Sequence, residues 1–257
     1  MQKIRLSIVS YINTLPFLYG INQSEELLQQ IEMHKDIPSV GANKMKNNFA
    51  DLGLIPVGAL LDMNDYQIVS DFCLATDNVV KTVKLISQKP LHEIKNIYLD
   101  YQSVTSRVLL KILAKEYWKI SPEYLQSNPG YEEKIEGETA GLIIGDRAFK
   151  IDENKFKYVW DLGIEWNSMT GLPFVFAVWI ANKPIDIEFL SLLNRCIGTG
   201  LTDIQKVIQH YRNSGSTDGV SNETLVEYYT ENMSYVLDDK KREAMRLFFE
   251  KAKSLNL

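Results

Sequence analysis

The stretch Ser103-Val104-Thr105-Ser106-Arg107 is the part of the sequence around which the rest of the chain is organised. An apolar strand is predicted before it, from Ile97 to Asp100, and an amphipathic helix after it. The helix is indicated by apolar residues at intervals of three and four, namely Val108, Leu109, Ile112, Leu113 and Tyr117. Hydroxyl side chains cap helix starts, and the unpaired amides there attract negative charge. The stretch is therefore either an ordinary helix cap or, with the charge of Arg107, a site for a small carboxylate.

The composition is that of an ordinary globular protein. The 257 residues can bury a large core as one large domain or two small ones, and 45% hydrophobic and 24% charged residues are typical of soluble proteins. Because 28 basic residues stand against 33 acidic ones, the net charge of −5 argues against a general nucleic-acid or anionic-membrane binder. The first residues enter an alternating strand without a signal-peptide core, and no apolar run reaches membrane-spanning length. We therefore expect a cytoplasmic protein without nucleic-acid or membrane partners.

Motifs for metal, nucleotide or disulfide chemistry are missing from the sequence. It contains no G-x-G-x-x-G, G-x-x-x-x-G-K-[ST], H-E-x-x-H or C-x-x-C pattern. Cys73 and Cys196 have no metal-like spacing, so we expect both to be reduced and buried. His34, His92 and His210 lie in charged or helical surface sequence, so we expect them to be solvated. No motif therefore points to a nucleotide or to zinc, and an enzyme of this design is predicted to work without an obvious histidine base.

Strands and helices alternate in two separate parts of the chain, as they do in parallel sheets. The first part has predicted strands at 4–9, 31–34 and 51–55, and the second has them at 97–100, 124–126 and 139–144. Two long extended stretches, 66–87 and 171–181, can carry the chain from one part to the other and back. The remainder is predicted to form four helices, at about 186–196, 201–212, 222–230 and 238–254.

This pattern predicts a two-lobed α/β protein with a ligand cleft between its lobes. Lobe 1 comprises residues 1–85 plus 177–257, and lobe 2 comprises residues 86–176. Ligands of such sheets bind outside the carboxyl ends of the strands, where the small polar residues of this chain gather. The candidate ligand-binding residues are Ser10, Asn13, Thr14, Pro56, Thr82, Ser103, Thr105, Ser106, Arg107, Gly145 and Asp146. The residues thus predict that a small anion is clamped, and leave open whether it also reacts.

Several of these residues have an ordinary structural interpretation as well. Asp146 follows a buried strand and stands beside Arg147, so it either forms a salt bridge or turn cap or lines the cleft. Asn13 either caps the short helix after it or hydrogen-bonds a ligand. The large aromatic residues of the second half are interpreted as core, namely Trp160, Trp166, Phe174, Phe176 and Trp179.

Five motifs, in this order, resemble the chorismate dehydratases of the futalosine route to menaquinone. They are Ser10-Tyr11-Ile12-Asn13-Thr14-Leu15-Pro16, Asp51-Leu52-Gly53-Leu54-Ile55-Pro56, Ser103-Val104-Thr105-Ser106, Ile144-Gly145-Asp146-Arg147-Ala148 and Thr170-Gly171-Leu172-Pro173-Phe174-Val175-Phe176-Ala177. The resemblance covers nearly the whole chain, and the motifs are specific as a set. It implies the type II periplasmic-binding-protein fold, used in the cytoplasm by a lyase that converts chorismate to 3-[(1-carboxyvinyl)oxy]benzoate and water. It also implies that no metal or organic cofactor takes part.

The resemblance implies roles for particular residues. Chorismate has two carboxylates, which suit an anion site from Ser103 to Arg107. In this family the side-chain carboxylate of the substrate is thought to act as the base while Asn and Ser groups hold it, and those roles fall to Asn13 and Thr82. Because loss of the hydroxyl aromatises the ring, the reaction needs desolvation and orientation more than a strong acid.

Thr82 marks a departure from the family. The family usually has Gly-x-Val-x-Ser-Val on this crossing, whereas this chain has Asn78-Val79-Val80-Lys81-Thr82-Val83. Threonine keeps the hydroxyl but adds a methyl group and stiffens χ1. Asparagine tolerates a left-handed backbone second only to glycine, so Asn78 can replace the glycine. We expect the chemistry to survive, with altered site geometry and rate.

Two alternative functions have the same expected lobes. A solute-binding protein for small carboxylates would normally carry an export signal, which the sequence does not show. The related 1,4-dihydroxy-6-naphthoate synthases rely on a histidine in the second lobe, and between Asp100 and Phe174 this chain has none.

Overall fold

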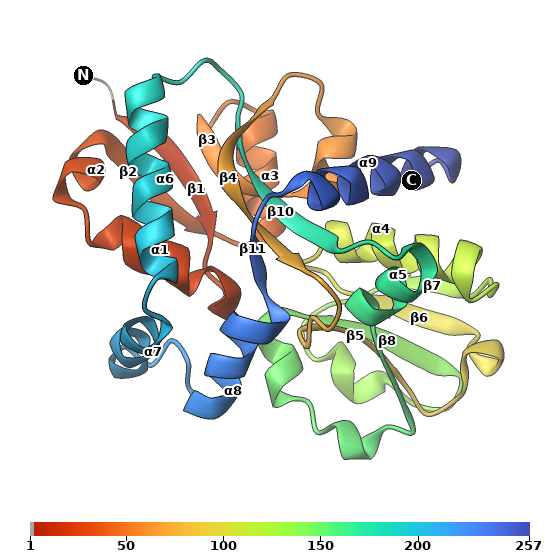
Figure 1. Ribbon diagram of the computed structural model, residues 1–257. Coiled ribbons are helices and arrows are strands. Elements are labelled where there is room, and N and C mark those ends of the chain that lie inside the picture. The colour runs from red at the N-terminus through yellow and green to blue at the C-terminus, as the bar shows by residue number, and fades with distance from the viewer. Residues whose placement is uncertain (1–2) are drawn as a thin grey trace.

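The computed structural model describes residues 3–257, which fold around two separate sheets (Figure 1). Within these residues the first sheet has six strands in the order β11-β4-β10-β3-β1-β2. Its strands β1 to β3 are parallel, as predicted, while β10 runs antiparallel to both β3 and β4. The six strands are β1 (Ile4–Val9), β2 (Ile31–Asp36), β3 (Leu52–Pro56), β4 (Gln67–Thr76), β10 (Phe174–Ala181) and β11 (Ser234–Val236).

The second sheet comes entirely from the middle of the chain. Over the described range it has five strands in the order β7-β6-β8-β5-β9, with β6 parallel to β7 and β8. They are β5 (Val83–Ser87), β6 (Asn96–Leu99), β7 (Glu123–Gln126), β8 (Thr139–Ile144) and β9 (Tyr158–Asp161). The two-lobed α/β architecture is therefore confirmed. The predicted lobe boundaries, after residues 85 and 176, fall inside β5 and β10, and the division at those residues stays a prediction.

Helices cover both faces of the first sheet. Along β10, Ala177 and Trp179 join the cluster formed with α1, α2, α6, α7 and α8, while Val178 and Ile180 join the one formed with α3 and α9. This alternation follows from the two-residue period of a strand. The helices are α1 (Leu15–Asn22), α2 (Glu25–Gln30), α3 (Pro38–Lys46), α4 (Thr105–Ile112), α5 (Leu162–Thr170), α6 (Ile187–Leu201), α7 (Ile204–Asn213), α8 (Asn222–Glu227) and α9 (Asp239–Ser254).

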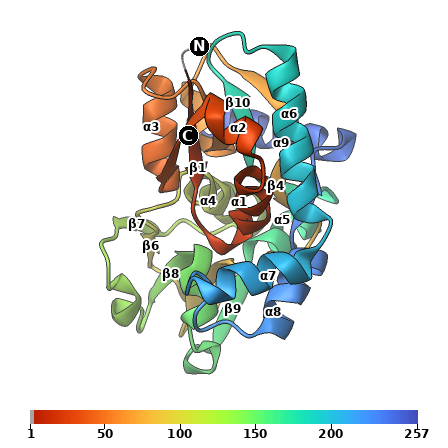
Figure 2. The ribbon, with the colours of Figure 1, turned by 90° about the vertical axis from the view of Figure 1, so that its left-hand side faces the viewer.

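Two parts of the C-terminal half join the lobes. On one side Phe248 of α9 packs against Trp166 of α5, with ring centroids 6.4 Å apart, and against Phe174 of β10 at 5.4 Å. On the other side α8 and the short η8 (Tyr228–Asn232) lie beside the second lobe (Figure 2). There the Tyr228 ring meets the Phe149 ring edge-on at 5.0 Å. The lobes are thus packed together at both ends of the cleft.

The local predictions hold for most elements, and α5 is the main helix that they missed. Its signals are the Asp161 carboxylate, which accepts hydrogen bonds from the Gly163 and Ile164 amides, and Gly171, which ends the helix at φ +71°. An Asp and a Gly in these places mark the two ends of a helix.

The structure tests three predictions about burial: buried cysteines, solvated histidines and no membrane-spanning segment. Cys73 and Cys196 are buried and free, as predicted. His92 and His210 are exposed, and the His34 side chain is half-exposed beside Glu32. Among residues 3–257, no helix combines the length and the apolar character needed to cross a membrane.

Candidate functional site

A cavity of about 70 Å³ lies between the lobes, at the carboxyl ends of β1 and β3. The first lobe contributes the short η1 (Ile12–Thr14), the end of β3 and part of β10, and the second contributes the start of α4 and the end of β8. Seven of the predicted site residues line it: Asn13, Pro56, Thr82, Ser103, Thr105, Ser106 and Gly145. The strand-end rule therefore located the meeting point of polar groups from both lobes.

A surface groove of about 720 Å³ is larger but has a different character. It runs along α2 and α6 on the first lobe alone, and its lining includes the charged Glu26, Asp186 and Arg195. None of its described lining residues comes from the second lobe. We place the candidate site in the smaller cavity, because polar groups from two lobes converge there on a mostly apolar lining.

Three predicted site residues lie away from the cavity. Ser10 is exposed, and Arg107 donates a hydrogen bond to the Gln126 side chain at 3.1 Å, on the outside of α4. The buried Thr14 hydroxyl lies 2.7 Å from each of two carbonyl oxygens of its own turn, those of Val9 and Tyr11. None of the three is on the cavity wall, so the positive charge expected from Arg107 is not supplied there.

The three hydroxyl groups at the start of α4 have different partners. The Ser103 oxygen accepts from the Ser106 amide at 3.0 Å, one residue before the N-cap of α4, Val104. The Thr105 hydroxyl accepts from the Gly58 amide at 3.0 Å and donates to the Phe176 carbonyl at 3.1 Å, which ties the lobes together. A Cβ on Gly58 would stand 2.7 Å from the Thr105 Cα, so this approach requires glycine. The buried Ser106 hydroxyl has no hydrogen bond to another described residue, and it is the one available to a ligand.

Asn13 lies on the cavity wall because two tyrosines hydrogen-bond to backbone carbonyls of η1. Tyr229 donates to the Ile12 carbonyl at 3.0 Å, and Tyr235 donates to the Asn13 carbonyl at 3.1 Å. The Asn13 side-chain oxygen is buried and finds no hydrogen-bond partner in residues 3–257. The N-cap of α1 is Thr14, and no side chain caps that helix, so the capping interpretation of Asn13 is wrong. A buried acceptor without a donor costs about 1–3 kcal/mol, which a ligand donor would recover.

Thr82 lies on the crossing between β4 and β5 with its hydroxyl at the cavity. The Thr82 oxygen is 2.9 Å from the Tyr228 phenol oxygen and 3.3 Å from the Val80 carbonyl. The left-handed residue of this crossing is Lys81, at φ +62°, and not Asn78. Asp161 holds it there by accepting from the Lys81 amide at 2.7 Å. The geometry around Thr82 is therefore set by tertiary contacts and not by the residue in the glycine position.

Asp146 lies beside the cavity and links the lobes. Its carboxylate accepts from the Ile12 amide, next to Asn13, at 3.0 Å, so it is neither a salt-bridge partner of Arg147 nor a wall residue. Burial raises the pKa of Asp146 to about 6. Its neighbour Gly145, at φ +65°, donates to the Thr82 carbonyl at 2.9 Å. The turn after β8 thus supports both Asn13 and Thr82.

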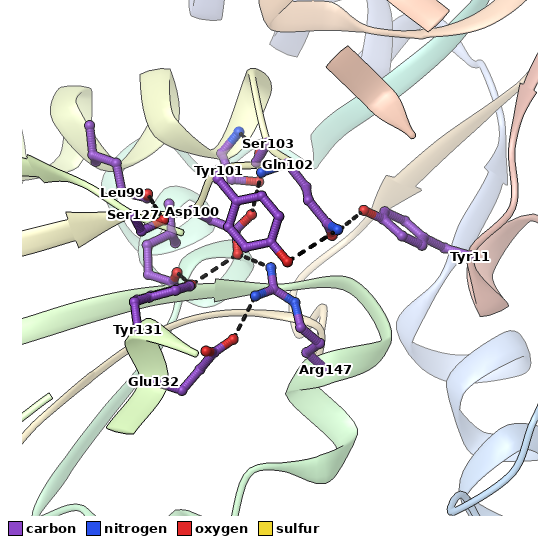
Figure 3. A network of polar contacts seen from close by, with 12 residues as sticks. Tyr11, Leu99, Asp100, Tyr101, Gln102, Ser103, Ser127, Tyr131, Glu132 and Arg147 are labelled. Atoms are coloured by element: carbon purple, nitrogen blue, oxygen red, sulfur yellow. Dashed lines mark hydrogen bonds and ion pairs between the residues drawn. The ribbon is translucent and has the colours of Figure 1, made fainter. Parts of the chain in front are cut away.

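A polar network behind the cavity holds the turn that leads into α4 (Figure 3). The fully buried Asp100 accepts from the Tyr131 hydroxyl at 2.9 Å and from the Gln102 amide at 2.8 Å, and it pairs with Arg147. The Gln102 side chain in turn accepts from the Tyr11 hydroxyl across the cleft at 2.7 Å. The sequence placed Arg147 with Asp146, but the structure uses it to fix the second-lobe side of the site.

None of the described residues that line the cavity is charged. The aromatic residues on the cavity wall differ from the sequence prediction. Phe176, which the sequence assigned to the core, lines the cavity together with Tyr11. Tyr228 was not singled out from the sequence, because the residue that it contacts in the site, Thr82, is 146 residues away in the chain. Within residues 3–257, no group of three or more His, Cys, Asp or Glu side chains could hold a metal ion. A bound anion would therefore rest on hydroxyl, amide and helix-start groups.

Comparisons with known proteins concern the family and the fold of the chain. A family model described as menaquinone biosynthesis matches residues 4–254. A chorismate dehydratase from Thermus thermophilus is 28% identical over 201 residues, which cover 71% of this chain and 72% of that protein. A solved structure from Archaeoglobus fulgidus is similar over 99% of this chain and 98% of that one, with a TM-score of 0.80 at 16% identity. The periplasmic aliphatic sulphonate-binding protein of Escherichia coli is similar over 97% and 92%, with a TM-score of 0.59 at 13% identity. The expected periplasmic-binding-protein-like fold is confirmed.

Proposed function

Because the chain belongs to the menaquinone biosynthesis family, we propose that it is a chorismate dehydratase, a hydro-lyase that acts in the cytoplasm. It removes water from chorismate and gives 3-[(1-carboxyvinyl)oxy]benzoate, without a metal or organic cofactor. One observation carries the proposal: the buried, unpaired side-chain oxygen of Asn13 and the hydroxyl of Thr82 face one cavity from different segments.

The reaction breaks bonds at two adjacent ring carbons. The ether-bearing carbon loses a proton, and the ring carboxylate takes up the negative charge through the conjugated ring alkene. The neighbouring carbon then loses its hydroxyl, which leaves with that proton as water, and the ring becomes aromatic. Because no described lining residue is Asp, Glu, His or Lys, we assign the base to the side-chain carboxylate of the substrate. The same carboxyl group then passes the proton to the leaving hydroxyl.

The protein groups in this scheme orient the substrate and do not exchange protons with it. Ser106 and the start of α4 hold one carboxylate, because that hydroxyl and the helix-start amides can donate. Thr82 donates to the other carboxylate, which acts as the base. The Asn13 amide offers a donor to that carboxylate and an acceptor to the substrate hydroxyl. Fixed polar groups of this kind lower the barrier because they need no reorganisation during the reaction.

The size of the cavity implies that the walls move when the substrate enters. Pockets that bury a small ligand commonly measure about 300–1,000 Å³. The cavity here is about 70 Å³, so chorismate needs the lobes to separate. The polar contacts between the lobes that would open include those from Tyr11 to Gln102 and from Ile12 to Asp146.

The test is incubation of the purified chain with chorismate, followed by ultraviolet absorbance and mass spectrometry. The proposal expects an aromatic product lighter than chorismate by one water, formed at a rate proportional to enzyme concentration. Chorismate that binds, seen as a raised melting temperature, but is never dehydrated would make this a binding protein and refute the proposal.

A further inference from the structure

We propose that Tyr228 is a positioning residue that directs the Thr82 hydroxyl proton toward the substrate, an inference that rests on the proposed function. Tyr228 begins η8, where the chain forms a π-helical turn. Its phenol oxygen lies 2.9 Å from the Thr82 oxygen, and the two residues are 1% and 3% exposed. A π-turn is rare and often lies at a functional site. Here it lets two consecutive tyrosines support different site residues, Thr82 and, through the Ile12 carbonyl, Asn13.

The two hydroxyl groups have too few protons for both to donate freely. Each of the two hydroxyl groups has one proton, and one of these protons occupies the bond between them. If Thr82 donated to Tyr228, it would have no proton left for a carboxylate in the cavity. When Tyr228 donates, the Thr82 oxygen accepts and its own proton is free to point elsewhere. In the absence of a ligand, that proton has the Val80 carbonyl at 3.3 Å as a long and weak alternative.

The surroundings of Tyr228 keep its phenol protonated and so able to donate. Burial raises the pKa of the Tyr228 phenol well above its usual range, and this effect outweighs the hydrogen bonds with Thr82 and Asn13, which lower it. The phenol is therefore protonated near neutral pH. A proton donated into the Thr82 oxygen also polarises the Thr82 O–H bond, which strengthens the bond that Thr82 gives to a carboxylate.

A second contact fixes the pair. Lys81 and Glu227, the residues directly before Thr82 and Tyr228, form an ion pair at 2.5 Å. The Tyr228 ring is also held edge-on by Phe149 at 5.0 Å. Because two adjacent residues on the crossing bind two adjacent residues on the α8–η8 segment, the phenol cannot easily turn away from Thr82.

The experiment is a double-mutant cycle with chorismate as the substrate. Tyr228→Phe removes the donor and keeps the ring, and we expect kcat to fall by about three- to tenfold with a smaller change in KM. In the Thr82→Val background the same change should alter kcat by less than about twofold, because the hydroxyl through which Tyr228 acts is gone. Tyr98→Phe, a half-buried tyrosine of β6 away from the cavity, is the matched control and should keep wild-type kcat.

The outcomes separate this inference from the proposed function. If the wild type dehydrates chorismate but Tyr228→Phe lowers kcat equally in both backgrounds, or only lowers the melting temperature, Tyr228 is structural and the inference is overturned. If the wild type does not dehydrate chorismate at all, the proposed function fails and takes the inference with it. Loss of kcat in the wild-type background alone supports the assignment.

Discussion

Replacing Asp161 by alanine should destabilise the protein more than the loss of an ordinary helix cap. The carboxylate accepts from two amides at the start of α5, those of Gly163 and Ile164, at 2.9 and 3.3 Å. It also accepts from two amides of the lobe crossing, those of Val80 and Lys81, at 3.1 and 2.7 Å. The cap is worth about 1 kcal/mol. Each crossing amide left without a partner costs about 1–3 kcal/mol.

Burial raises the pKa of Asp161, so desolvation of the charged carboxylate cancels part of the stabilisation that its hydrogen bonds provide. We therefore expect Asp161→Ala to lower the free energy of unfolding by about 3 kcal/mol, or Tm by roughly 6–12 °C at about 2–4 °C per kcal/mol. Turnover should also fall, because the crossing that carries Thr82 loses the contact that keeps Lys81 left-handed.

The matched control is Asp203→Ala. Asp203 caps α7 by accepting from the Lys206 amide at 3.1 Å, as Asp161 caps α5, but it does not hold a lobe crossing. Its loss should cost about 1 kcal/mol and leave turnover unchanged. Thermal melts of both variants, with chorismate kinetics, decide the matter. Equal losses of Tm in the two variants would show that the crossing does not depend on Asp161.

Three further outcomes are expected. Asn13→Ala should lower turnover by about a hundredfold without lowering Tm, because its side-chain oxygen has no partner to lose, and near-normal kinetics would remove Asn13 from the site. Thr82→Ser should keep or raise turnover, whereas Thr82→Val should lower turnover by about ten- to a hundredfold. The valine variant should also be about 1–3 kcal/mol less stable, since the buried Tyr228 phenol is left unpaired. A stable, fully active valine variant would contradict this. The pKa of Asp146 is higher in the folded protein than in the unfolded chain, so ionisation of this carboxyl destabilises the fold. Stability should therefore fall as the pH rises from about 4 to about 6. Asp146→Asn removes that cost, and its Tm relative to the wild type should increase over this range in thermal melts; a difference that stays constant with pH would argue against a buried, ionised Asp146.

The sequence alone predicted most of the local structure and the strand ends at which the cavity lies. Periodic apolar residues predicted most strands and helices, because a strand or helix with one buried face must repeat at its own period. The alternation of strands and helices predicted parallel strands, and hence polar residues gathered at their carboxyl ends. The resemblance then selected Asn13 and Thr82, and both line the cavity.

Only the tertiary structure decided which of the predicted polar groups are available to a ligand. Thr105 and Ser106 are neighbours at one helix start, yet the first is used up by Gly58 and Phe176 while the second is free. Arg107 lies on the outer side of the same helix, toward Gln126. Tyr228 is 146 residues from Thr82 in the chain, so no local pattern could pair them. A hydroxyl has one proton and few acceptor sites, and whether they are filled depends on segments that only the folded chain brings together.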